Sequence, residues 1–508
     1  MTQDYPDPTR RFLITLPLMV AMTMVAIDIT IANVALPHMQ AALNASQEQI
    51  LWVLTSYLIA GAVATPLSGW LANRYGRKLV MLASIAGFTV ASLLCGAAND
   101  IGTMCAARAL QGASGAALIP LGQAVLLDIN PPEQIAKAMT IFSLGSMAGP
   151  IIAPTLGGYL TDMISWRWVF FINIPFGVLS FIGMIFFMFE SKSERPPRFD
   201  LFGFIVVSTA LTAMQLMLDR GEHLDWFDSL EICIYALIAG TAAYLAIVHT
   251  ATTKDSFLNP RLYKDRNFSV GSLFSVLTGV ALFATIPLIV VMTQTLLGYT
   301  AFRTGMIGMP RALGTVIAML FINRLVNHID KRVLLVCGLA LNAFSLALYA
   351  RLDLYTDEWA LIVAGVIQGF AGGMMFLPLS VLVFSTMARD LRNEGAAMFS
   401  LTRNIGNAVG IALLQREVIH YTAESRNRLA EGVRPDSPAL QNASPDFDFG
   451  STGDVAGMGA EVGRQAAMVG NVGVYWLVVY ISLAMIPLVL LMRESAKRNT
   501  DGPIPAME

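Results

Sequence analysis

Residues 108–115 read Arg-Ala-Leu-Gln-Gly-Ala-Ser-Gly, and residues 365–372 read Gly-Val-Ile-Gln-Gly-Phe-Ala-Gly. Each stretch lies inside a long apolar run and is followed by Pro-Leu, with one extra residue before the second proline. An Ala-Met pair comes after both, at 138–139 and 397–398. The repeat relates an N-terminal block of six apolar runs to a C-terminal block in the same orientation. Parallel six-span halves around a central site are typical of rocking secondary transporters.

The composition places the chain in a lipid bilayer. Of its 508 residues, 55% are hydrophobic and 13% are charged, whereas a soluble domain carries about 25% charged residues. A membrane-spanning helix needs about 20 mainly apolar residues. Fourteen such runs are present, at 12–36, 50–71, 79–98, 101–127, 137–161, 168–189, 201–219, 229–251, 268–296, 304–326, 333–351, 358–387, 395–421 and 471–492. We therefore predict an all-α membrane protein with fourteen spans.

The predicted spans divide into three domains. Residues 1–190 form an N-terminal six-helix bundle, residues 191–260 hold two inserted transmembrane helices, and residues 261–508 form a C-terminal six-helix bundle. A long external loop, about 422–470, precedes the last span and is rich in Gly, Ser, Asp and Pro. This composition predicts a largely irregular loop that is either solvated or a docking surface for a periplasmic partner. Residues 457–468 have the better helix-forming composition.

Lysine and arginine are distributed unevenly between the two sides of the predicted membrane. With the N-terminus inside, internal segments hold twenty-one of these residues and external segments hold nine. Cytoplasmic loops of membrane proteins carry the excess of positive charge. We therefore expect both termini to be cytoplasmic.

Asp28 is the acidic residue that lies deepest in the predicted spans, near the end of an uncharged run that begins at Phe12. A carboxylate at the centre of a spanning helix costs roughly 2.5–3.5 kcal/mol on insertion scales, so a proton or cation site is the first interpretation. A neutral or paired structural aspartate is the alternative. The corresponding span of the second half, 268–294, has no acidic residue, and Gly365 stands where the first half has Arg108. Ion chemistry is therefore expected in the N-terminal half.

Arg108 is a candidate partner for Asp28 because the two residues lie at similar depth. Asp28 is eight residues before Leu36, or about 12 Å from the outer end of its span at 1.5 Å per residue. Arg108 is seven residues after Ile101, or about 10 Å from the outer end of its own span. A nearby opposite charge favours the ionised carboxylate, whereas burial favours the neutral form. Alternation between these environments would load and release a proton, so we predict that the pair couples transport to protons.

Two further motifs combine glycine with charge or proline. Residues 69–78 read Gly-Trp-Leu-Ala-Asn-Arg-Tyr-Gly-Arg-Lys; the glycines permit close helix approach, and the cations can hold helix ends at a gate. A purely topogenic role of the cations is the alternative. Residues 149–158 read Gly-Pro-Ile-Ile-Ala-Pro-Thr-Leu-Gly-Gly, a pattern that can form a pivot or seal because prolines bend the helix. The candidate residues are Gly69, Arg74, Gly76, Arg77 and Lys78 for gating, and Gly149, Pro150, Pro154, Gly157 and Gly158 for the pivot.

These motifs resemble those of a known family. Residues 69–78 resemble the loop signature of the major facilitator superfamily, although Asn73 stands where that family usually has Asp, so Arg74, Arg77 or Lys78 must pair differently. Arg108 with Gln111-Gly112 resembles the family's span 4 motif, and residues 149–158 resemble the antiporter signature of drug exporters. Residues 28–37 and 166–175 are similar to the fourteen-span drug/proton antiporter branch, the EmrB/QacA type. The long loop before the last span is closer to EmrB.

The resemblance implies a multidrug exporter of the bacterial inner membrane that exchanges substrate for protons. It implies partnership with a periplasmic EmrA-like adaptor and a TolC-type outer-membrane channel. No cofactor or metal is expected, since the drive would be an ion gradient and the chain has no phosphate-binding Gly-x-x-x-x-Gly-Lys-Ser/Thr motif. Nothing in the composition suggests a nucleic-acid partner. Four cysteines lie in apolar runs and are expected to be small core residues.

Substrate character follows from the apolar spans. Flexible Met and aromatic side chains suit promiscuous binding of apolar compounds, and the scarcity of deep acidic residues favours neutral, anionic or monocationic amphiphiles. Candidate substrate or cavity residues are Gln111, Met375, Phe376, Arg403 and Asn404. An exporter dedicated to one metabolite class, such as fatty acids or siderophores, is the closest alternative. A membrane enzyme is disfavoured because the five histidines are scattered and no nucleophile motif is present. A sensor or structural partner would not account for two repeated halves.

Overall fold

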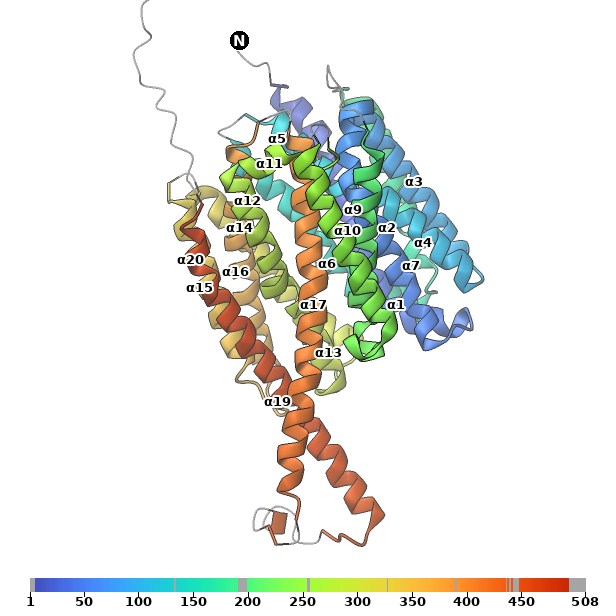
Figure 1. Ribbon diagram of the computed structural model, residues 1–508, viewed down its shortest axis with the longest axis vertical. Coiled ribbons are helices and arrows are strands. Elements are labelled where there is room, and N and C mark those ends of the chain that lie inside the picture. Colours follow the sequence, from blue (N-terminus) through green and yellow to red (C-terminus); the bar gives the residue numbers. More distant parts are fainter. Residues whose placement is uncertain are drawn as a thin grey trace, which may run out of the picture.

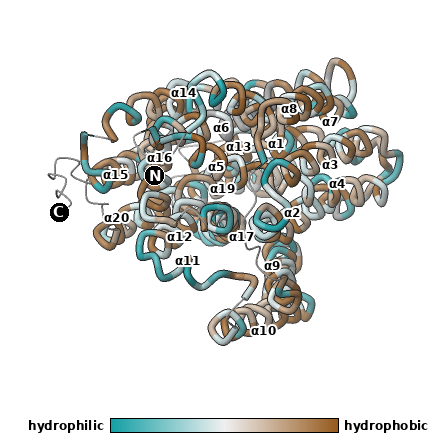
Figure 2. The backbone as a smooth tube through the Cα atoms, turned by 90° about the horizontal axis from the view of Figure 1, so that it is seen from above, coloured by the Kyte–Doolittle hydropathy of each residue, from teal (hydrophilic) through white to brown (hydrophobic). Residues whose placement is uncertain are grey.

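The computed structural model describes residues 5–131, 134–190, 199–253, 256–326, 328–388, 391–434, 436–437, 440–441 and 447–492, and its secondary structure over these residues is helical. Two groups of helices stand side by side when the molecule is seen along the bundle (Figure 2). The first half comprises α1 (Pro8–Ala42), α2 (Gln47–Tyr75), α3 (Arg77–Ala97), α4 (Ile101–Gly115), α5 (Leu118–Ile129), α6 (Ile135–Met163), α7 (Trp168–Phe171) and α8 (Asn173–Phe187). The second half comprises α11 (Pro260–Lys264), α12 (Arg266–Thr278), the π-helical turn η4 (Gly279–Phe283), α13 (Thr285–Thr295), α14 (Ala301–Leu325), α15 (Lys331–Tyr349), α16 (Glu358–Ser385), α17 (Arg392–Glu431), α19 (Thr452–Ala484) and α20 (Ile486–Val489).

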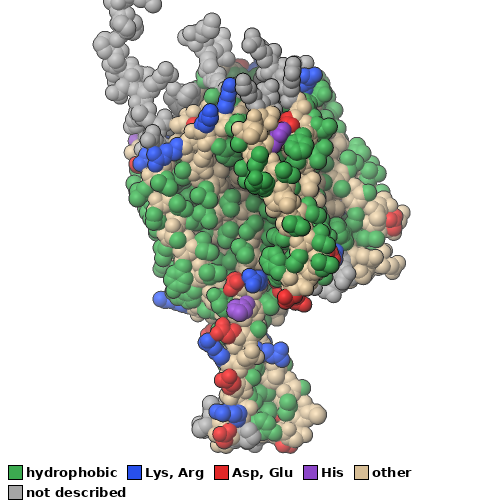
Figure 3. All heavy atoms as spheres, in the orientation of Figure 1, with side chains coloured by type: hydrophobic (Ala, Val, Ile, Leu, Met, Phe, Trp, Pro, Cys, Tyr) green, Lys and Arg blue, Asp and Glu red, His purple; other side chains and the backbone are tan. Residues whose placement is uncertain are grey.

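The described residues contain 12 helices that are long and apolar enough to cross a membrane. Two further long helices, α6 and α17, occupy the places of the fifth and thirteenth predicted spans, but they are not among these 12. Helix α17 carries Arg403, Asn404 and Asn407 within its central turns, which lowers its hydropathy. A total of fourteen spans therefore stays a prediction. Apolar side chains cover the middle zone of the molecular surface, and charged side chains lie mainly towards its two ends (Figure 3).

The fourth predicted span is divided into two helices. Helix α4 ends at Gly115, and α5 begins at Leu118. Pro120 lies in the first turn of α5, where its ring cannot donate a hydrogen bond to the carbonyl of Ala116. Pro120 favours this break but does not require it, because α16 stays continuous across Pro378 in the second copy.

The two inserted helices form a hairpin outside the main bundles. Helices α9 (Leu201–Gly221) and α10 (Leu230–Thr252) pack on each other, and α9 also packs on α2 and α17. In the view along the bundle α10 lies at the periphery (Figure 2). The division of the chain into three domains stays a prediction.

The long loop is more helical than its composition predicts. Helix α17 continues to Glu431 and α19 begins at Thr452, so a helical hairpin projects from one end of the molecule (Figure 1). The prediction of a largely irregular chain was wrong for residues 422–431, whereas the better helix-forming composition of residues 457–468 agrees with their place in α19. Residues 422–431 are rich in helix-forming Ala, Glu, Arg and Leu, and Glu424 accepts a hydrogen bond from Arg428 one turn later, at 2.6 Å. We call this projecting end the loop end, and the end where α1 starts the N-terminal end.

Candidate functional site

A polar cluster lies in the apolar interior of the first half. Asp28 on α1 and Arg108 on α4 form an ion pair, with 2.8 Å between Arg108 Nη1 and Asp28 Oδ2. Their side chains are 0% and 1% exposed. The structure thus shows a contact that the sequence left open, since similar depth made Arg108 only a candidate partner.

Other helices complete the hydrogen bonding of this cluster. Gln111 Nε2 and Asn173 Nδ2 each donate to Asp28 Oδ1 at 2.8 Å. Both amides also donate to the hydroxyl of Ser92, at 3.0 Å and 2.9 Å, and that hydroxyl donates to the carbonyl of Phe170. We call Asp28, Ser92, Arg108, Gln111 and Asn173 the Asp28 cluster. Its members come from α1, α3, α4 and α8, so the carboxylate is held by most of the first bundle.

Arg108 is held in place on its remaining sides by α2. Its Nε donates to the carbonyl of Val53 at 3.1 Å, and Nη1 also donates to Gln111 Oε1 at 2.7 Å. The guanidinium carbon lies 4.2 Å from the centroid of the Tyr57 ring, a cation–π contact. A buried cation needs such partners because burial removes it from water. Ser92 and Tyr57 were not predicted, because they stand in apolar runs without a distinguishing pattern.

The second half keeps the amide of this site, but Gly365 stands where the first half has Arg108. Gln368, which aligns with Gln111, donates to Thr285 Oγ1 at 3.1 Å. Thr285 lies on α13, in the span that corresponds to α1. The amide oxygen of Gln368 is buried without a hydrogen-bond partner among the described residues; in the first half, Arg108 supplies that donor to Gln111. The structure thus places the buried ion pair in the N-terminal half, as the sequence predicts.

The glycines of residues 149–158 fit α6 against α1 next to Asp28. A Cβ added to Gly149 would lie 2.2 Å from the backbone carbon of Ala26, and one added to Gly157 would lie 2.7 Å from Ile31. Gly158 has no atom within 4 Å of such a Cβ. Pro150 and Pro154 belong to the backbone of α6, but their side chains lie outside the described part of the chain. A pivot or seal at this motif stays a prediction.

A second polar network joins the two halves at the N-terminal end. Asp128 on α5 accepts hydrogen bonds from Arg77 of the first half and from Arg392 of the second half. Arg77 also donates to Asn393 Oδ1 at 2.6 Å. We call Asn73, Arg77, Asp128, Arg392, Asn393 and Glu394 the closing network.

Asn73 takes part in this network through both atoms of its amide. Its Nδ2 donates to Glu394 Oε1 at 3.0 Å, and its Oδ1 accepts from Asn393 Nδ2 at 2.6 Å. Asn259, in the segment before α11, donates to the other oxygen of Glu394 at 3.1 Å. An aspartate at position 73, as in the resembled signature, would place its carboxylate next to that of Glu394, and the two negative charges would repel each other. An asparagine avoids this repulsion and donates a hydrogen bond to Glu394 instead.

Glycines bring the helices of the closing network together. A Cβ on Gly69 would lie 3.1 Å from Glu394 Cα, so α2 approaches the start of α17 closely. Gly76 joins α2 to α3 with a φ of 94°, in the left-handed region that favours glycine. Of the predicted gating cations, Arg77 belongs to the network, Lys78 donates to the carbonyl of Ile185 at 2.7 Å, and Arg74 is exposed. The partners Asp128, Asn393 and Glu394 were not predicted from the sequence, because polar residues are common at helix ends and these three follow no recognisable pattern.

We expect the substitution Asn73→Asp to weaken the closing network. The new carboxylate would lose the hydrogen bond to Glu394 and stand beside its charge, and like charges at this distance repel. Alkylation of a cysteine placed at Leu127, which is 1% exposed at this end, should speed up at least tenfold. Adding Glu394→Gln should restore the slow rate, because an amide at position 394 can donate to the carboxylate introduced at position 73. Equal rates in the single and double variants would contradict this account.

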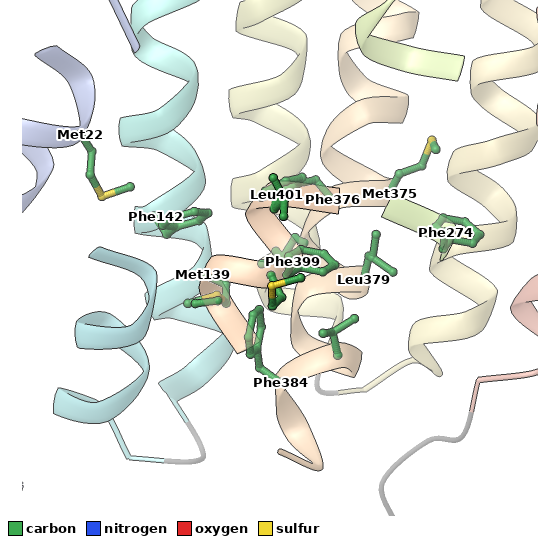
Figure 4. Packing of buried hydrophobic residues seen from close by; sticks show 14 of the residues in the cluster. Met22, Met139, Phe142, Phe274, Met375, Phe376, Leu379, Phe384, Phe399 and Leu401 are labelled. Carbon is green, nitrogen blue, oxygen red and sulfur yellow. The ribbon is translucent and has the colours of Figure 1, made fainter. Parts of the chain in front are cut away.

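The candidate substrate residues do not form one group. Gln111 belongs to the Asp28 cluster, and Met375 is fully buried against Gly338 of α15. Phe376 stacks on Phe142 of α6, with ring centroids 6.2 Å apart, and so connects the two halves. Arg403 lies 5.6 Å from the centroid of Phe376, and Asn404 is exposed. Figure 4 shows Phe142 and Phe376 facing each other while Met375 points away from the pair.

Two groups of long apolar helices, with a buried ion pair in the first half and a polar network joining the halves at one end, are typical of a multi-pass membrane transporter. The sequence profile of the Major Facilitator Superfamily matches residues 18–411, and the chain belongs to this superfamily. It is therefore a transport protein and not an enzyme.

Several curated relatives cover almost the whole chain. It is 31% identical over 507 residues to the multidrug export protein EmrB of Escherichia coli K12, covering 96% of this chain and 97% of that protein. The EmrB protein of Haemophilus influenzae is 31% identical, with 92% of each chain covered. The fatty acid resistance protein FarB of Neisseria gonorrhoeae is 32% identical, with 96% of this chain and 98% of that protein covered.

A solved structure supports the fold. The crystal structure of the human organic anion transporter MFSD10 (TETRAN) aligns with a TM-score of 0.59 and covers 94% of this chain and 100% of that chain. The two sequences are 12% identical, so the likeness concerns the fold alone. The chain thus resembles EmrB-type transporters in sequence and a second superfamily member in architecture.

Proposed function

We propose that this protein exports hydrophobic or amphiphilic compounds in exchange for protons, by alternating access. The observation that carries the proposal is the ion pair of Asp28 and Arg108, because both side chains are buried and belong to one half only. Ionisable groups inside a membrane protein typically mark ion pathways and proton relays. The similarity to the two EmrB proteins, which are named multidrug export proteins, supports the substrate class.

The coupling step uses the separation of α1 from α4. When Asp28 is paired with Arg108, the charged carboxylate is favoured; when the pair opens inside an apolar bundle, the neutral acid is favoured. Helix α6 contacts the backbone of α1 at Gly149 and also packs on α14 and α16 of the other half. A rocking motion of the two halves would therefore shift α6, and the contact of α6 with α1 would pass this shift on to Asp28. The proton gradient supplies the energy, and no cofactor takes part.

The placement in the membrane follows the distribution of positive charge. We assign the N-terminal end to the cytoplasm, which makes both termini cytoplasmic. The sequence-based excess of lysine and arginine on that side supports this assignment. The similarity to the EmrB proteins of two bacteria supports the bacterial inner membrane as the membrane. The closing network then joins the two halves at the cytoplasmic end.

The projecting hairpin offers a surface for partners outside the membrane. Helices α17 and α19 pack against each other, with Gly470 close to Thr422 and Gly473 close to Tyr421. Exposed charged residues line the hairpin (Figure 3), among them Arg428 and Arg464. We propose that this hairpin contacts an EmrA-like periplasmic adaptor, which would connect the exporter to a TolC-type outer-membrane channel.

Export of one metabolite class is the second candidate. The similarity to a fatty acid resistance protein is as extensive as that to the EmrB proteins. A fatty acid is an amphiphile, so the same coupling mechanism serves both candidates, and they differ only in the selectivity of the substrate site.

Everted membrane vesicles test the proposal. Vesicles that contain the protein should accumulate a labelled amphiphile when respiration acidifies their interior, and nigericin, which collapses the pH difference, should abolish the uptake. Addition of ATP in the presence of nigericin should not restore it. Uptake that survives loss of the pH difference would refute proton coupling, and absence of uptake for every amphiphile tried would refute the export function.

A further inference from the structure

Arg403 lies close to the middle of the membrane at the boundary between the two halves. It is eleven residues from the start of α17 at Arg392, or about 16 Å along the helix axis. The hydrocarbon core is about 30 Å thick, so this position is near the midplane. Transporters of this architecture bind substrate at the midplane between their repeats.

Arg403 has weak partners within the protein. Its Nη2 donates to the hydroxyl of Ser400 at 3.5 Å, and its guanidinium faces the ring of Phe376. Among the described residues, no carboxylate forms an ion pair with it. In contrast, Arg108 has Asp28, and Arg311 donates to the carbonyl of Leu282 at 3.2 Å. A guanidinium left without an anion in a membrane interior is costly and suggests a missing partner.

The surroundings of Arg403 are aromatic and aliphatic. The ring beneath its guanidinium, Phe376, stacks nearly parallel to Phe142 of the other half, at an interplanar angle of 10°. Met139 and Leu401 belong to the same buried cluster, and Figure 4 shows them near the two rings. A ligand at this place would therefore meet one cation and an apolar wall formed by both halves.

We infer that Arg403 binds the anionic head group of an amphiphilic substrate, whose tail packs on Phe142 and Phe376. The guanidinium offers paired donors that match a carboxylate. Phe142 and Phe376 come from opposite halves and are buried against each other in this arrangement, so a tail reaches both rings when the halves move apart. This inference rests on the proposed export function and narrows its substrate class to amphiphiles with an acidic head group.

Three probes with the same twelve-carbon tail isolate the head group: laurate, dodecanol and dodecyltrimethylammonium. Binding of each radiolabelled probe to the purified protein in lipid nanodiscs is measured at neutral pH. The unaltered protein should bind laurate at least tenfold more tightly than the other two. Arg403→Gln should weaken laurate binding about tenfold or more, as expected for loss of a hydrogen bond between charged groups. Its affinity for dodecanol should change less than twofold.

Two matched variants separate charge from structure. Arg403→Lys keeps the cation and should retain most of the laurate affinity, whereas Arg416→Gln removes an exposed arginine of the same helix and should leave all three affinities unchanged. Equal laurate binding by Arg403→Gln and the unaltered protein, loss of all three probes, or a preference for dodecyltrimethylammonium would overturn the inference. The same three probes are then tested in the everted vesicles. Uptake of the cationic or neutral probe with rejection of laurate leaves the export function standing, whereas uptake of none refutes that function itself.

Discussion

Asp28→Asn is expected to reduce proton-driven uptake in everted vesicles to the level of vesicles without the protein. An amide at 28 can still accept a hydrogen bond from Arg108, but it cannot alternate between a charged and a neutral form. The substitution also leaves Arg108 as an uncompensated buried charge, a change that costs about 3–5 kcal/mol in folded proteins. Downhill exchange of substrate between preloaded vesicles and buffer needs no proton coupling, and it should persist wherever the variant remains folded.

A control for Asp28→Asn uses the same substitution at a different depth. Asp100 caps the start of α4 and is exposed, where its carboxylate accepts from the backbone of Thr103 at 2.8 Å. Hydrogen bonds from Thr103 hold the pKa of Asp100 below its usual value, and asparagine is an equally good cap. Asp100→Asn should therefore leave uptake unchanged. Unimpaired proton-driven uptake by Asp28→Asn would remove the basis of the proposed coupling.

Asp128→Asn is expected to open the N-terminal end of the molecule. Asp128 is the shared acceptor of Arg77 and Arg392, which belong to different halves. Without its charge the two guanidinium groups face each other without compensation. Hydrogen bonds to charged groups contribute about 1.5–3 kcal/mol, so the ratio of closed to open molecules should fall roughly 10- to 150-fold.

Pulsed electron spin resonance measures this shift. Spin labels at the exposed positions Arg74 and Lys264, in a cysteine-free background, report the distance between the halves at this end. The Asp128→Asn protein should populate a longer distance than the unaltered protein. Glu190→Gln, which alters an exposed carboxylate after α8 at the same end, should not. An unchanged distance distribution in Asp128→Asn would show that the closing network does not hold this end shut.

The sequence predicted the fold and the charges inside the spans because a membrane restricts which residue types can stand in a spanning helix. A charged residue in hydrocarbon is costly, so Asp28 and Arg108 stand out against their apolar neighbours, and helix rise alone estimates their depth. The repeat of residues 108–115 at 365–372 then shows that only one half carries the pair. Their contact required the structure, since equal depth does not determine which sides of two helices face each other.

The helical hairpin at the loop end shows the opposite case. Gly, Ser, Asp and Pro in residues 432–451 lower the helix propensity of the loop as a whole and hide the helix-forming stretch of residues 422–431. Packing of α17 on α19 extends both helices beyond the bundle, as Gly470 lies against Thr422. Tertiary packing of this kind supplies most of the stability of helices in proteins.

The sequence by itself determined that this protein is a membrane transporter with a repeated half and with Asp28 and Arg108 inside the spans of the first half. A helix in the hydrocarbon core must be mainly apolar, and each charge inside it costs free energy. Both features can therefore be recognised from the residue types alone. Only the tertiary structure decided how the halves meet. Arg392 and Asp128 are 264 positions apart, and Phe142 stacks on Phe376 across the same boundary. Such partners are chosen by the packing of whole helices, which no local pattern encodes.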